Sequence, residues 1–315
     1  MPFGREVPHV NGANLGWTFA IPATGTYTLL NEGYYYQTGT INVNFTLAQQ
    51  TVTSAPLVLN DQVSGTLAGR QSLAQYSFTV DQASTIVFDI LDTQTGNAAY
   101  VDWKLTGPKG DVSQWSSFNY TDYGTSYALP PGHYTLTLRN EQDLPASYKF
   151  RVLNRDAAVP LTVGANVSDT IPANETRLYC FNANAGDHFY LDGQNSSYYY
   201  STEGYCYWSL LDPFGKTISS GYTYNDAPDI VANATGEYLL VVSPISTYYA
   251  PAAAPHVARF TLGSRTSSTA TLTLGADISG SVAHPAETVK YSFTLAAPTT
   301  LLVDTGNASH TNSWT

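Results

Sequence analysis

Short runs in which apolar and polar residues alternate cover most of the chain. Two clear examples are the segments 85–90 and 238–242. Glycine, proline, asparagine and aspartate bound these runs, and no window of about eleven residues shows the apolar spacing of an amphipathic helix. Evenly spaced short strands separated by turns are typical of antiparallel sandwiches. The pattern therefore predicts an all-β protein built from tandem antiparallel β-sandwich domains.

Three sets of aromatic residues recur with a period of about 105 residues. The first is a tryptophan, followed in its first two copies by a Pro-x-Gly turn. The second is the tyrosine of a Gly-x-Tyr motif, and the third is the tyrosine of a Tyr-x-Phe motif. The members are Trp103, Trp208 and Trp314; Tyr27, Tyr134 and Tyr238; and Tyr76, Tyr179 and Tyr291. We expect these rings to fill the core of each sandwich, although exposed rings on which a ligand stacks are the alternative.

The repeats place one complete domain at residues 56–156 and a second at residues 159–265. Residues 268–315 carry the first half of a third domain, up to the tryptophan. Residues 1–52 carry the second half, from the turn onward. The sequence thus predicts a split sandwich whose seam joins Trp314 and Thr315 to the turn formed by Met1, Pro2, Phe3 and Gly4.

A half-sandwich exposes an apolar face and unpaired strand edges, which attract other strands. The complementary half of another copy could complete it, and this head-to-tail association would build a filament. The other half of the same chain could complete it in a closed ring. Flanking repeats of a longer chain could do so as well, and the sequence leaves all three partners open.

Several motifs in the repeats are similar to a known family. Glu-Thr-x-x-Tyr-x-Phe occurs at residues 175–181 and 287–293, and Trp-x-Leu-x-x-Pro-x-Gly occurs at residues 103–110 and 208–215. Together they resemble the tandem pre-peptidase-C-terminal-like β-sandwich repeats of large bacterial secreted and surface proteins. Residues 69–72 of the first repeat depart from the Glu-Thr pattern. The resemblance implies a sandwich fold and an extracellular bacterial setting, in which such repeats serve as stalks, adhesive modules or enzyme appendages.

The amino-acid composition excludes some classes of binding partner. Charged residues make up 12% of the chain, the formal net charge is −11, and only 13 residues are lysine or arginine. Nucleic acid is therefore not an expected partner, because phosphate binding needs a concentrated basic surface. No apolar run approaches the length that a transmembrane helix requires. We expect an extracellular or cell-surface location.

The two cysteines, Cys180 and Cys206, both lie in the second repeat. A disulfide between them is one possibility for an extracellular protein. Strand alternation leaves open the other possibility, two buried thiols. It places Cys206 on the inward face with Trp208, but Cys180 between the inward residues Tyr179 and Phe181.

Catalytic signatures are missing from the sequence. It contains no Gly-x-Ser-x-Gly elbow, no His-Glu-x-x-His motif and no phosphate-binding loop, and its six histidines lack the spacing of metal ligands. We therefore expect no enzymatic activity and no cofactor. Asp89, Asp192 and Asp304 recur after one strand of each repeat, where they could help to bind Ca²⁺ or, more simply, cap turns.

Tyrosine clusters interrupt the alternation, so some of their rings must face outward. Such rings could form contacts between subunits, stack on surface glycans, or cover edge strands. The clustered residues are Tyr34, Tyr35, Tyr36, Tyr198, Tyr199, Tyr200, Tyr248 and Tyr249. The sequence favours an extracellular structural protein that forms a filament, fibre or stalk by completing its split domain between copies. The alternative is a carbohydrate-binding or adhesive region of a larger surface protein.

Overall fold

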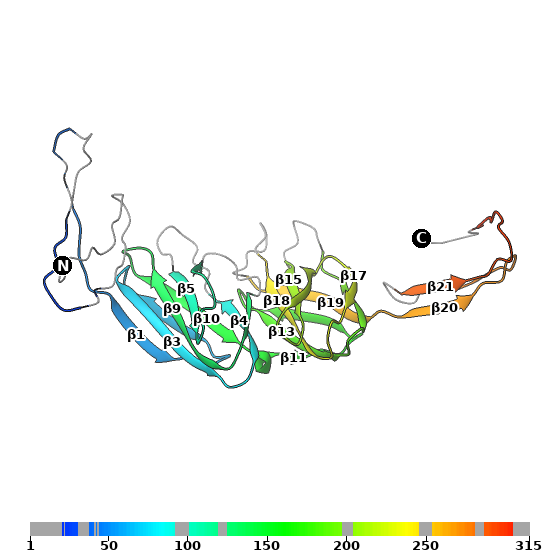
Figure 1. The fold of residues 1–315 in the computed structure, drawn as a ribbon, viewed down its shortest axis with the longest axis horizontal. Coiled ribbons are helices and arrows are strands. Elements are labelled where there is room, and N and C mark those ends of the chain that lie inside the picture. The colour runs from blue at the N-terminus through cyan, green and yellow to red at the C-terminus, as the bar shows by residue number, and fades with distance from the viewer. Residues whose placement is uncertain are drawn as a thin grey trace. The chain divides into compact units, whose positions relative to one another are not determined.

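The computed structural model describes residues 21, 23–30, 38–40, 42, 44–91, 101–118, 125–196, 204–245, 254–280 and 287–304. The chain divides into two compact units (Figure 1). Unit one comprises residues 1–157 and 173–175, and unit two comprises residues 158–172 and 176–315. The described residues are all-β apart from one 3-10 turn, Arg155–Ala157, which confirms the predicted fold class. The four predicted segment boundaries stay a prediction.

Unit one contains two sheets. The first has the strand order β1-β3-β9-β5-β6, with β7 paired to β5, and the second has the order β2-β10-β4-β8. All pairs are antiparallel except β1 with β3, which is parallel. The strands are β1 Thr51–Pro56, β2 Val63–Leu67, β3 Ser72–Val80, β4 Ser84–Ile90, β5 Val101–Gly107, β6 Gly110–Asp111, β7 Ser116–Ser117, β8 Ser126–Leu129, β9 Gly132–Asn140 and β10 Ala146–Leu153.

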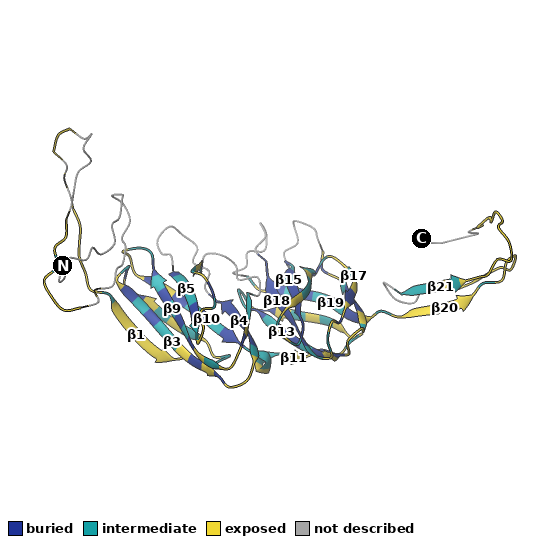
Figure 2. Cartoon of the chain, viewed as in Figure 1, coloured by how far each residue is buried: buried dark blue, intermediate teal, exposed yellow. Residues whose placement is uncertain are grey.

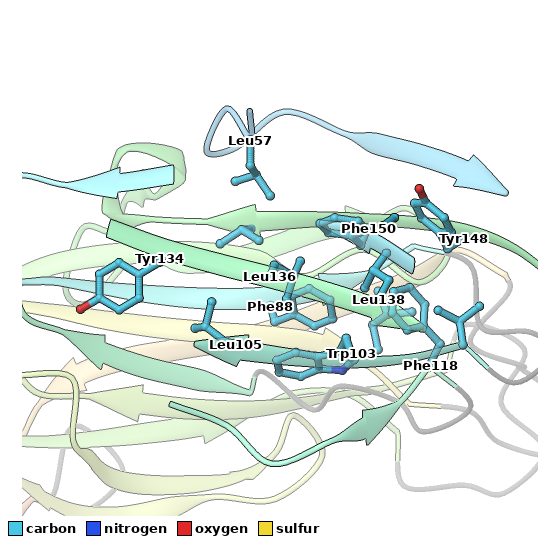
Figure 3. Close-up of a cluster of buried hydrophobic side chains, with 14 of the residues drawn as sticks. Leu57, Phe88, Trp103, Leu105, Phe118, Tyr134, Leu136, Leu138, Tyr148 and Phe150 are labelled. Carbon is cyan, nitrogen blue, oxygen red and sulfur yellow. The ribbon is translucent and has the colours of Figure 1, made fainter. Parts of the chain in front are cut away.

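The core of unit one lies between these sheets. Alternate residues of β9 are buried, as its alternating sequence predicts, and they meet buried residues of β4, β5 and β10. Trp103 on β5 stacks on Phe88 of β4, with ring centroids 4.0 Å apart, and Phe150 of β10 packs against the same phenylalanine (Figure 3). The two sheets therefore enclose one aromatic core.

Unit two repeats the same topology. Its sheets have the orders β11-β13-β18-β15-β16 and β12-β19-β14-β17, with β11 parallel to β13. The strands are β11 Val159–Pro160, β12 Asn166–Ile171, β13 Arg177–Ala183, β14 His188–Gly193, β15 Cys206–Leu211, β16 Thr217–Tyr222, β17 Ala227–Val231, β18 Gly236–Pro244 and β19 His256–Ser264. Trp208, Tyr238 and Phe260 lie in its core.

The terminal segments hold little regular structure. In the C-terminal segment, which we define as residues 267–304, β20 (Ser267–Thr271) pairs in parallel with β21 (Thr288–Ser292). In the N-terminal segment, residues 21–50, the described residues contain no strand. Figure 2 shows buried residues gathered on the strands of the two sandwiches, whereas β20 is exposed along its length.

The structure contains no disulfide between Cys180 and Cys206, so that possibility was wrong. The strand register explains why. Strand β18 lies between the strands that carry the cysteines, and on it Cys180 pairs with Leu239 whereas Cys206 pairs with Pro244. The offset along β18 alone amounts to about 17 Å, and a disulfide needs Cα atoms within about 7 Å.

The Cys206 thiol is expected to be unreactive in the folded protein. Its residue is fully buried, and burial, followed by the charge of Asp169, raises its pKa to about 12. Only the thiolate reacts. A Cys180→Ser variant should therefore resist labelling by a thiol reagent at pH 8 and become labelled when it is unfolded in guanidinium. Rapid labelling of the native variant would contradict this burial.

Candidate assembly surfaces

Large apolar side chains are exposed at both ends of the chain. Phe45 is 66% exposed, although the corresponding residues of the complete sandwiches, Phe150 and Phe260, are fully buried. Val303 is 70% exposed, whereas its counterpart Phe88 is 1% exposed. The remaining exposed apolar residues of these segments are Ile21, Leu29, Leu30, Leu47, Leu274, Ile278, Phe293, Leu295, Leu301 and Leu302. The exposed positions include those at which a complete sandwich has its core.

The C-terminal segment has the local geometry of the start of a sandwich. Its parallel pair joins Ala270 to Tyr291. The first sandwich joins Ala55 to Tyr76 in the same way, and the second joins Val159 to Tyr179. The tyrosine of the Tyr-x-Phe motif thus pairs with an equivalent parallel strand in all three copies.

The N-terminal segment has the local geometry of the end of a sandwich. The hydroxyl of Tyr27 donates to the carbonyl oxygen of Ala23, four residues upstream, at 2.6 Å. The hydroxyls of Tyr134 and Tyr238 make the same bond to carbonyl oxygens four residues upstream, at 2.6 and 2.8 Å. This is the tyrosine corner found in many sandwiches. The corner therefore forms in the N-terminal segment although the described residues there form no core.

The strand order of a complete sandwich explains why few strand pairs form within either terminal segment. Among the described strands of the first sandwich, β1 to β5 form the first half, and the only pair within it is β1 with β3. The described strands β8, β9 and β10 of the second half pair only with strands of the first half. A first half alone can thus form one parallel pair, which is what β20 and β21 form. A second half alone can form none of these pairs. The described residues of the two segments have the strand content expected of an unpartnered half.

The predicted core residues lie in different environments. Trp103, Trp208, Tyr134, Tyr238 and Tyr179 are buried in the two sandwiches. Tyr76 is half-buried, and its hydroxyl lies 2.6 Å from that of Tyr148. The terminal counterparts Tyr27 and Tyr291 are half-buried without a complete core. The other residues named in the sequence analysis, at the predicted seam and in the tyrosine clusters, lie outside the described part of the chain. They are Met1, Pro2, Phe3, Gly4, Trp314, Thr315, Tyr34, Tyr35, Tyr36, Tyr198, Tyr199, Tyr200, Tyr248 and Tyr249.

The turn after Trp208 is fixed by a buried carboxylate. Asp212 accepts hydrogen bonds from the backbone N–H groups of Phe214 and Lys216, both at 2.9 Å, and from Asn233 at 2.8 Å. Burial raises the pKa of Asp212, but these bonds together outweigh it and hold the pKa below its usual value. The opening sequence Pro2-Phe3-Gly4 repeats the turn residues Pro213-Phe214-Gly215.

A cluster of four half-buried tyrosines on unit two was missed by the sequence reasoning. Tyr222 stacks on Tyr224 with centroids 5.2 Å apart, and Tyr205 and Tyr207 meet these rings edge-on. The available signal was the Tyr-x-Tyr spacing at residues 205–207 and 222–224, because alternate residues of a strand share a face. The cluster presents aromatic rings and hydroxyl groups together.

Two of the three acidic residues considered for Ca²⁺, Asp89 and Asp192, bond to other side chains, and Asp304 lies in the C-terminal segment. The fully buried Asp89 accepts a hydrogen bond from Arg151 Nε at 2.7 Å, and Asp192 accepts one from Gln194 at 2.9 Å. In the part of the chain that the structure describes, no group of three or more histidine, cysteine, aspartate or glutamate side chains could hold a metal ion. The carboxylate of Asp89 thus forms an ion pair with Arg151 on the neighbouring strand of the same sheet.

Comparisons with known proteins find similar solved structures only. No protein-family model and no curated protein matches the chain. The pre-peptidase C-terminal domain of a Bacillus anthracis collagenase is 19% identical, with a TM-score of 0.26 over 34% of this chain and 99% of that domain. The CUB1-EGF-CUB2 region of rat MASP-1 is 8% identical, with a TM-score of 0.22 over 68% of this chain and 100% of that one.

A third similar structure is a fucolectin from striped bass serum. It is 8% identical, with a TM-score of 0.18 over 64% of this chain and 85% of that one. The resemblance to pre-peptidase-C-terminal-like repeats is thus accompanied by one such domain among the similar structures, and membership of that family stays a prediction. Within the described residues, no helix is both long and apolar enough to cross a bilayer.

Proposed function

We propose that this chain is an extracellular structural protein whose copies associate head-to-tail into a filament, fibre or stalk. In this proposal the C-terminal segment of one copy and the N-terminal segment of the next complete one β-sandwich. The observation that supports it best is the exposure of Phe45, Leu47 and Val303 at positions where both complete sandwiches have buried core residues.

Physical chemistry favours such completion. Burying one large apolar side chain stabilises an association by roughly 1.5–3 kcal/mol, and several such residues are exposed in each segment. Main-chain pairing along the open strands adds to this and fixes the direction of the partner. The low charge of the chain, 12% of residues, leaves little electrostatic repulsion between segments. We propose no catalytic activity and no cofactor.

Electron microscopy of the purified chain tests the proposal. The full chain should form filaments, and a chain ending at Arg265 should not, because it lacks the segment that accepts the next copy. Isolated particles from both chains would overturn the proposal. Filaments from both chains would show that other surfaces drive association.

A carbohydrate-binding or adhesive role is the second candidate, and the cluster formed by Tyr205, Tyr207, Tyr222 and Tyr224 favours it. Rings of this kind stack on the apolar faces of sugars, and their hydroxyl groups can form hydrogen bonds. A glycan-binding screen with the full chain and a Tyr222→Ala variant tests this role. Binding that is lost in the variant supports it, whereas equal signals from both proteins, or no signal, would reject this cluster as a glycan site.

A further inference from the structure

Equivalent residues pair between strands in the two complete sandwiches. The same pairing can be applied to the equivalent residues of the N-terminal and C-terminal segments. We infer that the strands of two copies interleave within both sheets of the shared sandwich, with Phe293 paired to Tyr27 and Ile278 paired to Phe45 of the next copy. This inference rests on the proposed head-to-tail association. In this arrangement the shared sandwich is an exchange of strands, not a contact between two preformed halves.

The pairing in the first sheet follows from two matching templates. In the first sandwich Phe78 pairs with Tyr134, and in the second Phe181 pairs with Tyr238. These rings also stack, with centroids 5.5 and 5.6 Å apart. The motifs that contain these residues recur at Phe293 and Tyr27. The equivalent pair should therefore join β21 to the tyrosine-corner segment of the next copy, antiparallel and with stacked rings.

The same register fixes the neighbours of that pair that face away from the core. Ser77 pairs with Thr135 in the first sandwich, and Cys180 pairs with Leu239 in the second. The equivalent residues are Ser292 in the C-terminal segment and Thr28 in the N-terminal segment of the next copy, and both are exposed in the single chain. An engineered cross-link at these two positions would therefore report the register without disturbing the core.

The second sheet gives an independent pairing. Val63 pairs with Phe150, and Val167 pairs with Phe260, so Ile278 is placed opposite Phe45.

On its other side the strand of Phe150 pairs with β4, where Val152 meets Phe88, and β19 pairs with β14, where Leu262 meets Leu191. The equivalent pair is Leu47 with Val303. The residues around Phe45 are therefore expected to become a strand between two strands of the neighbouring copy.

The occupant of each open segment is a second copy of this chain because the chain carries both complements. The described residues of the N-terminal segment include the tyrosine corner and the Phe45 motif at residues 44–47, which are not found in the C-terminal segment. Those of the C-terminal segment include a parallel strand pair, which is not found in the N-terminal segment. A strand that is bonded on both sides cannot leave without breaking two ladders. Separation of the copies should therefore be slow.

Disulfide trapping in the full chain tests the register. A Cys180→Ser background removes the half-buried thiol and introduces the residue type found at Ser77 and Ser292. Thr28→Cys and Ser292→Cys are then placed on separate chains, which are mixed while unfolded, refolded together and oxidised. Covalent dimers are expected on non-reducing gels, at about tenfold or greater yield than from a mismatched mixture. Asn44→Cys mixed with Ser279→Cys provides the same test for the second sheet.

The mismatched mixture combines Thr26→Cys with Lys290→Cys, which are also exposed. In the inferred register these residues lie four positions apart, about 13 Å, and cannot form a disulfide. Filaments that cross-link only through this pair would overturn the register and leave the proposed function standing. A covalent ring from a chain with both Thr28→Cys and Ser292→Cys, without dimers from the mixture, would overturn both. Absence of both filaments and cross-links would also overturn both.

Discussion

A Phe45→Asp substitution is expected to abolish association of the chain and leave the two complete sandwiches folded. Phe45 is largely exposed in the single chain, so the change costs the isolated protein little. In a completed sandwich this position is fully buried, as Phe150 and Phe260 are. A carboxylate buried there would cost several kcal/mol. At about 4 kcal/mol the association constant falls about a thousandfold, which sedimentation velocity would register as a loss of large species.

Phe214→Asp provides the matched control. Phe214 is 72% exposed in a turn of unit two, and its own side chain belongs to no core cluster. The same charge at this position should leave association unchanged. Equal association by the wild type and Phe45→Asp would contradict completion through the Phe45 strand. Equal losses in both variants would point to a general effect of added charge.

A Trp103→Ala substitution is expected to destabilise the first sandwich by about 3–5 kcal/mol, the usual cost of removing a buried tryptophan. Trp103 is 3% exposed, stacks on Phe88, and contacts Tyr127 edge-on. Removing it leaves a large cavity between two well-packed sheets. Urea unfolding followed by circular dichroism measures the change in the free energy of unfolding.

Trp115→Ala is the control within the same unit. Trp115 is half-buried, and its ring lies under the guanidinium group of Arg139, with the guanidinium carbon 4.1 Å from the ring centroid. Losing a partly exposed cation–π contact costs about 0.5–1 kcal/mol. If both variants lost similar stability, Trp103 would not have the core role that its burial assigns to it.

Much of the fold could be predicted from the sequence because a sandwich repeats its chemistry. Alternation fixed which residues of β9 face inward, and the recurring tryptophan and tyrosine identified the core at Trp103, Trp208, Tyr134 and Tyr238. The same repeats predict that the terminal segments are halves of one domain, and this stays a prediction. These predictions needed only local patterns, because successive side chains of a strand point to opposite faces of the sheet.

Other features depend on which strands become neighbours, and local patterns do not carry that information. The parallel pairing of β1 with β3 and the separation of Cys180 from Cys206 by β18 both follow from the strand order. The cluster around Tyr222 also forms because β15 and β16 are adjacent. The sequence showed the Tyr-x-Tyr spacing but could not show that two such segments meet.

Complementation between two truncated chains tests the central claim most directly. One chain lacks residues 268–315, and the other lacks residues 1–50, so each has a single open segment and both retain the two complete sandwiches. Light scattering should show two monomers when the chains are kept apart and a one-to-one heterodimer that grows no further when they are mixed. A mixture that keeps the monomer masses at high concentration would contradict the completion of one sandwich by two copies.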